Sequence, residues 1–420
     1  MALDELAPFL RSRTDAVADQ LCELIRFRSM VGGEGPLAQH LHEQFRSLAD
    51  EATLVPVSDA IKEDPDYSDP VRGLTYSDRP NLRVRKRGAG GGRALIVNTH
   101  LDVVPPSEGD AGQFEPRREG GRIYGRGACD AKGQIAAIYW ALAALDALQL
   151  RLGGDLEVHL VIEEEVGGNG TVAMARTNPR ADGAIVMEPT DFAILPQVRG
   201  AVWFEATVRG QSGHSGQPGG TISALTKALE AIAIFRRYHD RALAESRGKY
   251  PLFDEHADPA PLLIGQLEAG DWPSKAPQQA VFKGVLGVLP DRTKEQVMDD
   301  LRQGLRTEGD AWLAENSEVR FTYRHDASVI APDHPLAKTI ERACAEAGRQ
   351  TKVAAMTASC DAWMYNNQLG IPTVVFGPGS LSVAHSSIEH IEVADVIKGA
   401  EVLVRLLCDW CGCGTSEGSA

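Results

Sequence analysis

The chain has 420 residues, of which 43% are hydrophobic, and its 43 lysines and arginines against 58 aspartates and glutamates give a net charge of −15. This length exceeds what one compact core holds and predicts two or three domains. The acidic balance, without a long basic run, argues against nucleic acid or an anionic membrane as a partner and favours cations.

The N-terminal segment lacks the continuous apolar stretch of a signal peptide, and no segment has the ~18 uninterrupted apolar residues of a membrane span. The seven cysteines are an odd number scattered along the chain, which favours reduced thiols over a disulfide framework. We therefore expect a cytoplasmic protein.

The predicted elements begin with two helices in residues 15–48, where apolar residues recur at helical spacing on both sides of a break at 31–33. An extended segment, NLRVRKR, a glycine-rich turn at 88–92 and a strand within ALIVNTHLDVV follow. Strands and helices then alternate, with a long helix at 132–150, as far as the strand GAIVM at 183–187. This rhythm predicts an α/β fold with a central mixed sheet flanked by helices.

From about Val198 the order changes to strand, helix, strand, strand, helix, strand, which is the split βαβ pattern of a small α+β domain. After about His325 the α/β rhythm resumes and ends in a helix within EVADVIKGAEVLVRLL. The sequence therefore predicts a catalytic domain made of residues 1–197 and 326–420, with an inserted domain at 198–325. We expect the tail, CGCGTSEGSA, to be disordered.

Polar side chains follow the ends of several predicted strands. In NTHLDVV, His100 and Asp102 share one face of the strand, and the pair fits either a buried hydrogen bond or a metal ligand oriented by a carboxylate. Asp130 lies on a glycine-rich turn that opens a helix, where a helix cap is the commoner role. Glu188 follows GAIVM, and His385 lies in a glycine-rich loop beyond TVVFG.

Three consecutive glutamates, Glu163, Glu164 and Glu165, directly follow an apolar strand. A solvated acidic loop is the commoner explanation of such a run, but the apolar strand before it argues against that explanation here. In a regular strand Glu164 and Glu165 would point to opposite faces, so both can serve one site only if the chain leaves the pleat. Gly167 and Gly168 permit such a departure.

Five of these side chains lie just beyond strand ends or at a helix start, where open α/β sheets build their binding crevice. They are His100, Asp130, Glu165, Glu188 and His385. Two imidazoles and three carboxylates can hold two divalent ions if one carboxylate bridges them. Such a pair of ions would also offset the repulsion among clustered acids, so the sequence predicts a dinuclear metal site.

In their order and spacing, HLDVVP, GRGACDAKG, EEEVGGNGT, EPT and AHSSIEHI resemble the acetylornithine deacetylase, succinyl-diaminopimelate desuccinylase and glutamate carboxypeptidase family of dinuclear zinc hydrolases. The likeness runs from IRFRSMVGGEG to the last helix. It implies a catalytic α/β domain, an inserted lid domain of βαββαβ order that often mediates dimerisation, and two divalent metal ions. Zinc is the first expectation for these ions, with cobalt or manganese as alternatives, and a homodimer through the lid is expected.

The resemblance also assigns the predicted metal ligands to two sites. By motif, Asp130 would bridge the two ions. His100 and Glu188 would complete one metal site, and Glu165 and His385 would complete the other.

Three further roles follow from the same motifs. Asp102 would orient His100, and Glu164 would be the general base, which takes a proton from the attacking water and returns it to the leaving amine. His214, in VRGQSGHSGQPGG, resembles a lid histidine that stabilises the oxyanion, sometimes from the partner subunit, although a surface-loop histidine is the commoner interpretation. Glu163 stands where the family commonly has aspartate.

Other conspicuous residues favour a structural role. The glycine-rich segment at 88–92 precedes a strand, which predicts a turn and not a phosphate-binding loop. His159, within LEVHLVI, is expected to be a packed strand residue. Cys408, Cys411 and Cys413 lack a fourth ligand nearby, so their spacing does not predict a structural zinc site.

Two departures from the family concern the substrate. Arg292 follows Pro290 in GVLGVLPDRT, whereas many members bind the substrate carboxylate with an arginine before a Pro-Gly pair, and Trp363 occupies a position at which the family often has arginine. The second change implies a more apolar pocket. We predict hydrolysis of an N-acyl amino acid or related small amide. The alternatives are a dipeptidase or carboxypeptidase of the same family and a non-catalytic metal-dependent binding protein.

Overall fold

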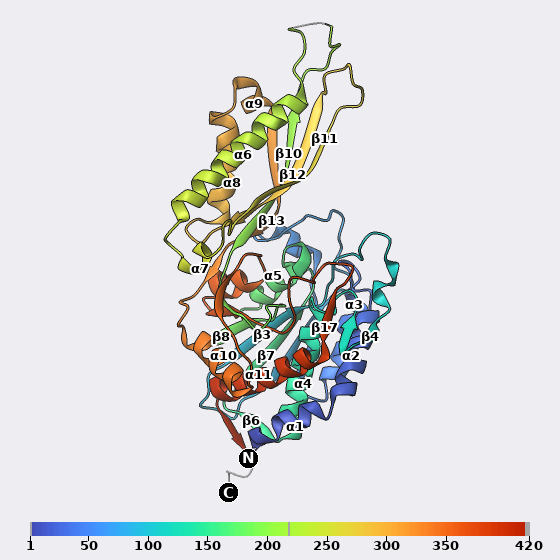
Figure 1. Ribbon diagram of the computed structural model, residues 1–420, viewed down its shortest axis with the longest axis vertical. Coiled ribbons are helices and arrows are strands. Elements are labelled where there is room, and N and C mark those ends of the chain that lie inside the picture. The colour runs from blue at the N-terminus through green and yellow to red at the C-terminus, as the bar shows by residue number, and fades with distance from the viewer. Residues whose placement is uncertain (1, 217–218, 416–420) are drawn as a thin grey trace.

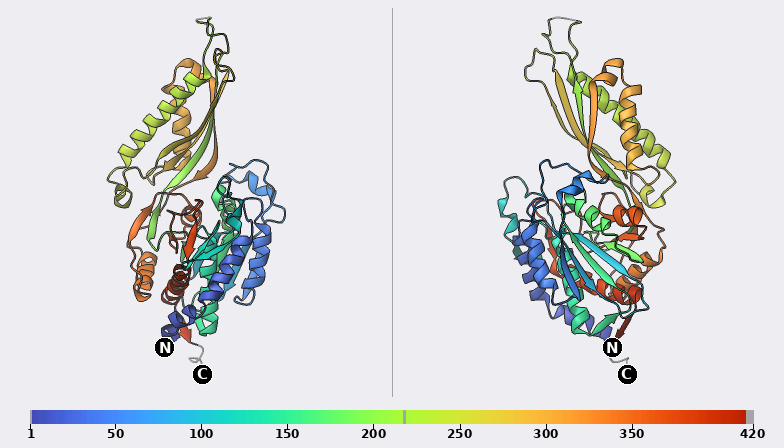
Figure 2. Two further views of the ribbon diagram at one scale, coloured as in Figure 1. Left: turned by 45° about the vertical axis from the view of Figure 1, so that its right-hand side comes forward. Right: turned by 180° about the vertical axis from the view of Figure 1, so that it is seen from behind.

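The computed structural model describes residues 2–216 and 219–415. Figures 1 and 2 show two regions arranged along the long axis, a large region that contains the first and the last described residues and a small region at the opposite end. Within the described ranges, no helix combines the length and the apolar character that crossing a bilayer demands.

A nine-stranded mixed sheet forms the centre of the large region, in the order β1-β2-β7-β3-β8-β16-β9-β14, with β15 paired to β9. Its strands are β1 (Glu51–Val55), β2 (Asn81–Lys86), β3 (Leu95–His100), β7 (Leu156–Val161), β8 (Gly183–Val186), β9 (Ile194–Val198), β14 (Ser328–Val329), β15 (Val353–Met356) and β16 (Thr373–Val375). The central strands β7, β3, β8 and β16 run parallel to one another. Every residue of β3 is buried, as expected for a central parallel strand.

Helices flank this sheet (Figure 2). They are α1 (Leu6–Arg11), α2 (Thr14–Arg26), α3 (Gly35–Phe45), α4 (Lys132–Ala147), α5 (Asn169–Arg176), α10 (Pro335–Glu346) and α11 (Val393–Cys411). α4 and α11 pack against each other, and their buried residues join those of β3 in one apolar core. The predicted fold class, an α/β region with a mixed sheet flanked by helices, is confirmed, although α1 was not predicted.

The small region consists of a four-stranded antiparallel sheet, β11-β12-β10-β13, with helices on one face only (Figure 2). Its elements are β10 (Gly200–Arg209), α6 (Ala224–Ser246), α7 (Pro251–Asp254), β11 (Leu262–Ala269), β12 (Gln279–Val288), α8 (Lys294–Thr307), α9 (Ala311–Asn316) and β13 (Ser317–His325). The order of strands and main helices is the predicted βαββαβ order. A core of its own fills the space between sheet and helices. The exact domain boundaries stay a prediction.

Two small sheets complete the large region, one of order β17-β5-β4 and one of order β18-β6. Their strands are β4 (Arg117–Glu119), β5 (Arg122–Tyr124), β6 (Leu150–Leu152), β17 (His390–Glu392) and β18 (Cys413–Thr415). The expectation of a disordered tail is therefore wrong for β18, which pairs with β6, and its last part, 416–420, lies outside the described residues. The turn at 88–92 packs here too, and a Cβ atom on Gly92 would lie 1.7 Å from the Cys411 carbonyl oxygen.

Candidate metal centre

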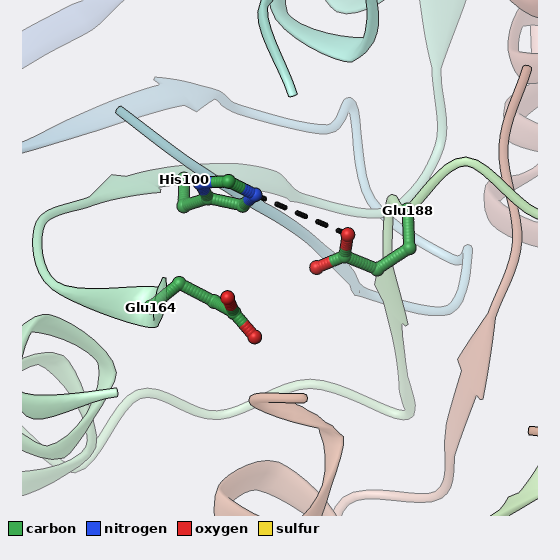
Figure 3. Close-up of side chains that lie close together, drawn as sticks. All are labelled: His100, Glu164 and Glu188. Atoms are coloured by element: carbon green, nitrogen blue, oxygen red, sulfur yellow. Dashed lines mark ion pairs between the residues drawn. The ribbon is translucent and has the colours of Figure 1, made fainter. Parts of the chain in front are cut away.

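The parallel strands β7, β3 and β8 end at the same edge of the large sheet. His100 is the last residue of β3, Glu188 lies two residues beyond β8, and Glu164 lies three residues beyond β7. Figure 3 shows these three side chains gathered together, and the His100 Nε2 atom lies 3.9 Å from Glu188 Oε2. Parallel topology thus brings together residues that are far apart in the sequence.

The chain leaves the pleat directly after β7, as the glycines predicted. Glu163 has a φ of 63°, residues Glu164–Val166 form a single 3-10 turn, and Gly168 has a φ of 69°. The Asp102 carboxylate accepts hydrogen bonds from the backbone N–H groups of Glu164 and Glu165, each at 3.1 Å. Its Oδ1 atom also lies 3.6 Å from the Nδ1 atom of His100. Asp102 therefore contacts both the imidazole and the acidic turn.

Asp130 lies between the two histidines. Its Oδ1 atom is 2.9 Å from His100 Nε2, and its Oδ2 atom is 3.3 Å from His385 Nε2. His385 Nε2 also lies 3.1 Å from Glu165 Oε1. Each oxygen of one carboxylate thus faces a different imidazole, which is the arrangement that a bridging ligand requires.

The ligand-type atoms fall into two overlapping groups. Those of His100, Glu164 and Glu188 lie within 4.8 Å of one another, and so do those of His100, Asp130 and Glu165. His100, Asp130 and Glu188 are each at most 6% exposed, whereas the side chain of His385 is 49% exposed. The structure therefore brings all five predicted ligands and Glu164 into one buried cluster that is open on the side of His385.

Burial and close contacts shift the pKa values of this cluster. Burial raises the pKa of Glu164 and that of Glu188 well above the usual carboxyl range. Burial also favours a raised pKa for Asp130, but hydrogen bonds with His100 and His385 outweigh it and lower the pKa of Asp130. Hydrogen bonds to Asp130 and then to Glu165 raise the pKa of His385 to about 10. Several carboxylates of the cluster are therefore buried at positions where their negative charge requires a positive charge nearby.

The donor set fits divalent metal ions. Among the described residues, the buried Oε1 atom of Glu188 has no hydrogen-bond partner, so a carboxylate oxygen is available for a ligand. Imidazole nitrogens together with carboxylate oxygens are the donors that zinc, cobalt and manganese accept in proteins. Without such ions, burying several carboxylates together costs free energy, because each charged group loses its hydration.

Two buried arginines near the cluster form ion pairs that were not predicted from the sequence. Arg126 pairs with Glu389, and both side chains are at most 1% exposed. Arg79 pairs with Glu34 at 2.7 Å and with Glu163 at 2.5 Å. Arg126 and Glu389 stand inside the motifs GRGACDAKG and AHSSIEHI, which is the one signal that could have singled them out.

The structure shows the surroundings of the two residues that depart from the family motifs, and those of Trp363 differ from the expected apolar pocket. Trp363 is 2% exposed, and the Nζ atom of Lys294 lies 3.9 Å from the centre of its ring. Its indole is therefore packed between the two regions and does not line an open pocket. Arg292 bonds within the small region, with its Nη2 atom 3.2 Å from Glu245.

His214 lies outside the cluster. It belongs to the segment that follows β10 and precedes α6, and Figure 1 shows that β10 runs away from the large region before this segment begins. Its Nδ1 atom accepts a hydrogen bond from the backbone of Gly216 at 3.0 Å. Among the described residues, no hydrogen bond or ion pair joins His214 to the cluster, so its role at the oxyanion stays a prediction.

The fold and the cluster are those of a metal-dependent hydrolase. A family model described as peptidase family M20/M25/M40 matches residues 96–409. The chain belongs to this family, which confirms the resemblance inferred from its motifs.

Individual relatives agree with this assignment. The acetylornithine deacetylase of Myxococcus xanthus is 32% identical, over 80% of this chain and 85% of its own length. An N-formyl-4-amino-5-aminomethyl-2-methylpyrimidine deformylase of Bacillus subtilis (strain 168) is 25% identical, over 80% of this chain and 84% of its own length. The structure of a dipeptidase from Saccharomyces cerevisiae superposes with a TM-score of 0.77 at 14% identity, covering 97% of this chain and 98% of that one.

Proposed function

We propose that this protein hydrolyses the amide bond of an N-acyl amino acid or a related small amide, with two divalent metal ions, zinc first among them. The observation that carries the proposal is the position of Asp130, whose two oxygens face His100 and His385. His100 and Glu188 would complete one metal site, and Glu165 and His385 the other. Bound there, the ions would supply Lewis-acid polarisation of the amide carbonyl and a more acidic water.

Glu164 is the side chain that we assign to proton transfer. It is 9% exposed, it lies beside His100 and Glu188, and burial raises its pKa. It would take a proton from the attacking water and deliver it to the leaving amine. Asp102 supports this geometry, because it holds the turn of Glu164 by a backbone hydrogen bond.

Cleavage of an acyl group has the support of the two sequence relatives, a deacetylase and a deformylase. A dipeptidase or carboxypeptidase acts on the same kind of bond and is the second candidate.

The test is a panel of N-acetyl, N-formyl, N-succinyl, N-carbamoyl and dipeptide substrates, assayed with added zinc, cobalt or manganese. Turnover of acyl amino acids above dipeptides would support the proposal. The reverse order would favour a peptidase, and metal binding without any turnover would make the chain a binding protein.

We also propose that the small region acts as a lid and joins two chains into a dimer, with His214 supplied to a site across that dimer. Apolar side chains exposed on this region support a protein contact. Leu263 is 59% exposed, Leu267 is 40% exposed and Trp272 is 68% exposed. A cytoplasmic location stays a prediction.

A further inference from the structure

Two turns that carry predicted metal ligands are held in the same way. In each, a buried carboxylate accepts hydrogen bonds from two successive backbone N–H groups. Asp102 holds Glu164 and Glu165 in this manner. On the other side of the cluster, the Oε1 atom of Glu389 accepts from the N–H groups of Cys129 and Asp130, each at 3.2 Å. Glu389 belongs to neither predicted metal site.

Arg126 connects this carboxylate to a second ligand-bearing segment. Its Nη1 atom donates to Glu389 Oε2, and its Nη2 atom donates to the carbonyl oxygens of His385 and of the Gln113 side chain, both at 3.3 Å. Arg126 is 1% exposed. The pair therefore ties the backbone at Asp130 to the backbone at His385, two residues far apart in the sequence.

The contacts of Glu389 and Arg126 affect the separation of Asp130 and His385, on which a site for two metal ions depends. The two oxygens of Asp130 reach His100 and His385 only while the turn before α4 and the loop before β17 keep their distance. Glu389 fixes the backbone on the Asp130 side, and Arg126 fixes it on the His385 side. Without the carboxylate, two backbone N–H groups and a buried guanidinium would lose their acceptor.

We propose that Glu389, together with Arg126, is a positioning residue that holds Asp130 and His385 at the separation required to bind two metal ions. The proposal rests on the dinuclear site proposed above. Residues that orient metal ligands in this way commonly change metal affinity by about 10 to 100-fold when they are replaced.

The test is Co²⁺ binding to the metal-stripped full-length protein. Titration calorimetry measures the affinity and the number of bound ions, and the visible absorption of bound Co²⁺ reports on its ligands. Glu389→Gln keeps the size of the side chain but removes its charge. We expect at least one of two Co²⁺ equivalents to bind about 10-fold or more weakly, with a changed absorption spectrum per bound ion. The matched control is Glu401→Gln, because Glu401 is 4% exposed and pairs with Lys398 and Arg405 on α11, away from the cluster.

A purely structural role predicts a different result. Both variants would then lower the melting temperature, and both would bind Co²⁺ with the affinity and spectrum of the unaltered protein, which would overturn the proposal. If Glu389→Gln does not fold, Arg126→Lys decides, since it keeps the charge but loses the two-pronged contact. Unchanged Co²⁺ affinity in Arg126→Lys would also overturn the proposal. Failure of the unaltered protein to bind two ions would instead contradict the dinuclear site itself.

Discussion

The nine-stranded sheet of the large region and the four-stranded sheet of the small region differ in the side chains that are buried against them. The edge of the large sheet buries acids such as Glu164 and Glu188. The small sheet buries aromatic rings, with Phe282 packed edge to face against Phe204 at 6.1 Å and against Phe235 at 5.7 Å between ring centres. The large region therefore buries charged groups that need oppositely charged or hydrogen-bonding partners, whereas close apolar packing stabilises the small region.

The two regions should therefore respond differently to substitution. In the large region, replacing one charged side chain leaves another buried group without its partner, so the loss should appear in metal binding and rate. In the small region, replacing a ring leaves a cavity, so the loss should appear in stability. Three experiments test whether the two regions differ in this way.

The largest effect is expected at Glu164. Replacing it by alanine should lower kcat by about 10² to 10⁴-fold, because proton transfer loses its base, while bound metal stays at the level of the unaltered protein. Steady-state rates and elemental analysis of the purified variant measure the two quantities. Glu318→Ala, an exposed position on β13, is the control and should leave both unchanged. Loss of metal together with rate would make Glu164 a ligand.

The next effect is expected at Phe282, which is fully buried. Phe282→Ala should lower the free energy of unfolding of the small region by about 3 to 5 kcal/mol, through lost burial and a residual cavity. Denaturant unfolding monitored by circular dichroism measures this change. Metal content should remain unchanged, since the core of this region is separate from that of the large sheet.

Leu229→Ala is the matched control for Phe282→Ala. Leu229 lies on α6 of the same region but is 54% exposed and outside the proposed dimer contact, so its replacement should change stability by less than about 0.5 kcal/mol. A metal site that disappears in Phe282→Ala would show that the two regions are not independent.

The smallest effect is a partial recovery that joins the two regions. If His214 acts across a dimer, a mixture of His214→Ala and Glu164→Ala chains should regain up to about one quarter of the activity, because half of the dimers are then mixed and each has one intact site. Rates measured before and after subunit exchange, with gel filtration of each variant, test this. No recovery from an exchanging dimer would place His214 in the site of its own chain or outside catalysis.

The sequence was most informative where local pattern decides the structure. Apolar runs located the strand that ends at His100 and the strand that ends two residues before Glu188, and paired glycines located the turn of Glu164. His159 was expected to be a packed strand residue, and it is fully buried with its Nδ1 atom 2.9 Å from the Tyr365 hydroxyl. These features depend on residues close together in the chain.

What the sequence did not reveal depends on residues far apart. Arg126 and Glu389 are separated by 263 positions, and no periodicity connects them. The packing of Trp363 against Lys294 likewise joins segments from the two regions. The strand β18 was not predicted because a short polar tail carries no strand pattern, and its pairing partner β6 is far away in the sequence.

The exposure of His385 has a consequence for how ions enter and leave. Four of the five predicted ligands have side chains that are at most 8% exposed, and His385 alone has half of its surface in water. The half of the site that contains His385 and Glu165 therefore faces the solvent, while the half that contains His100 and Glu188 lies behind it. Two otherwise similar ions would then have unequal lifetimes, with the outer one exchanging first and the inner one retained.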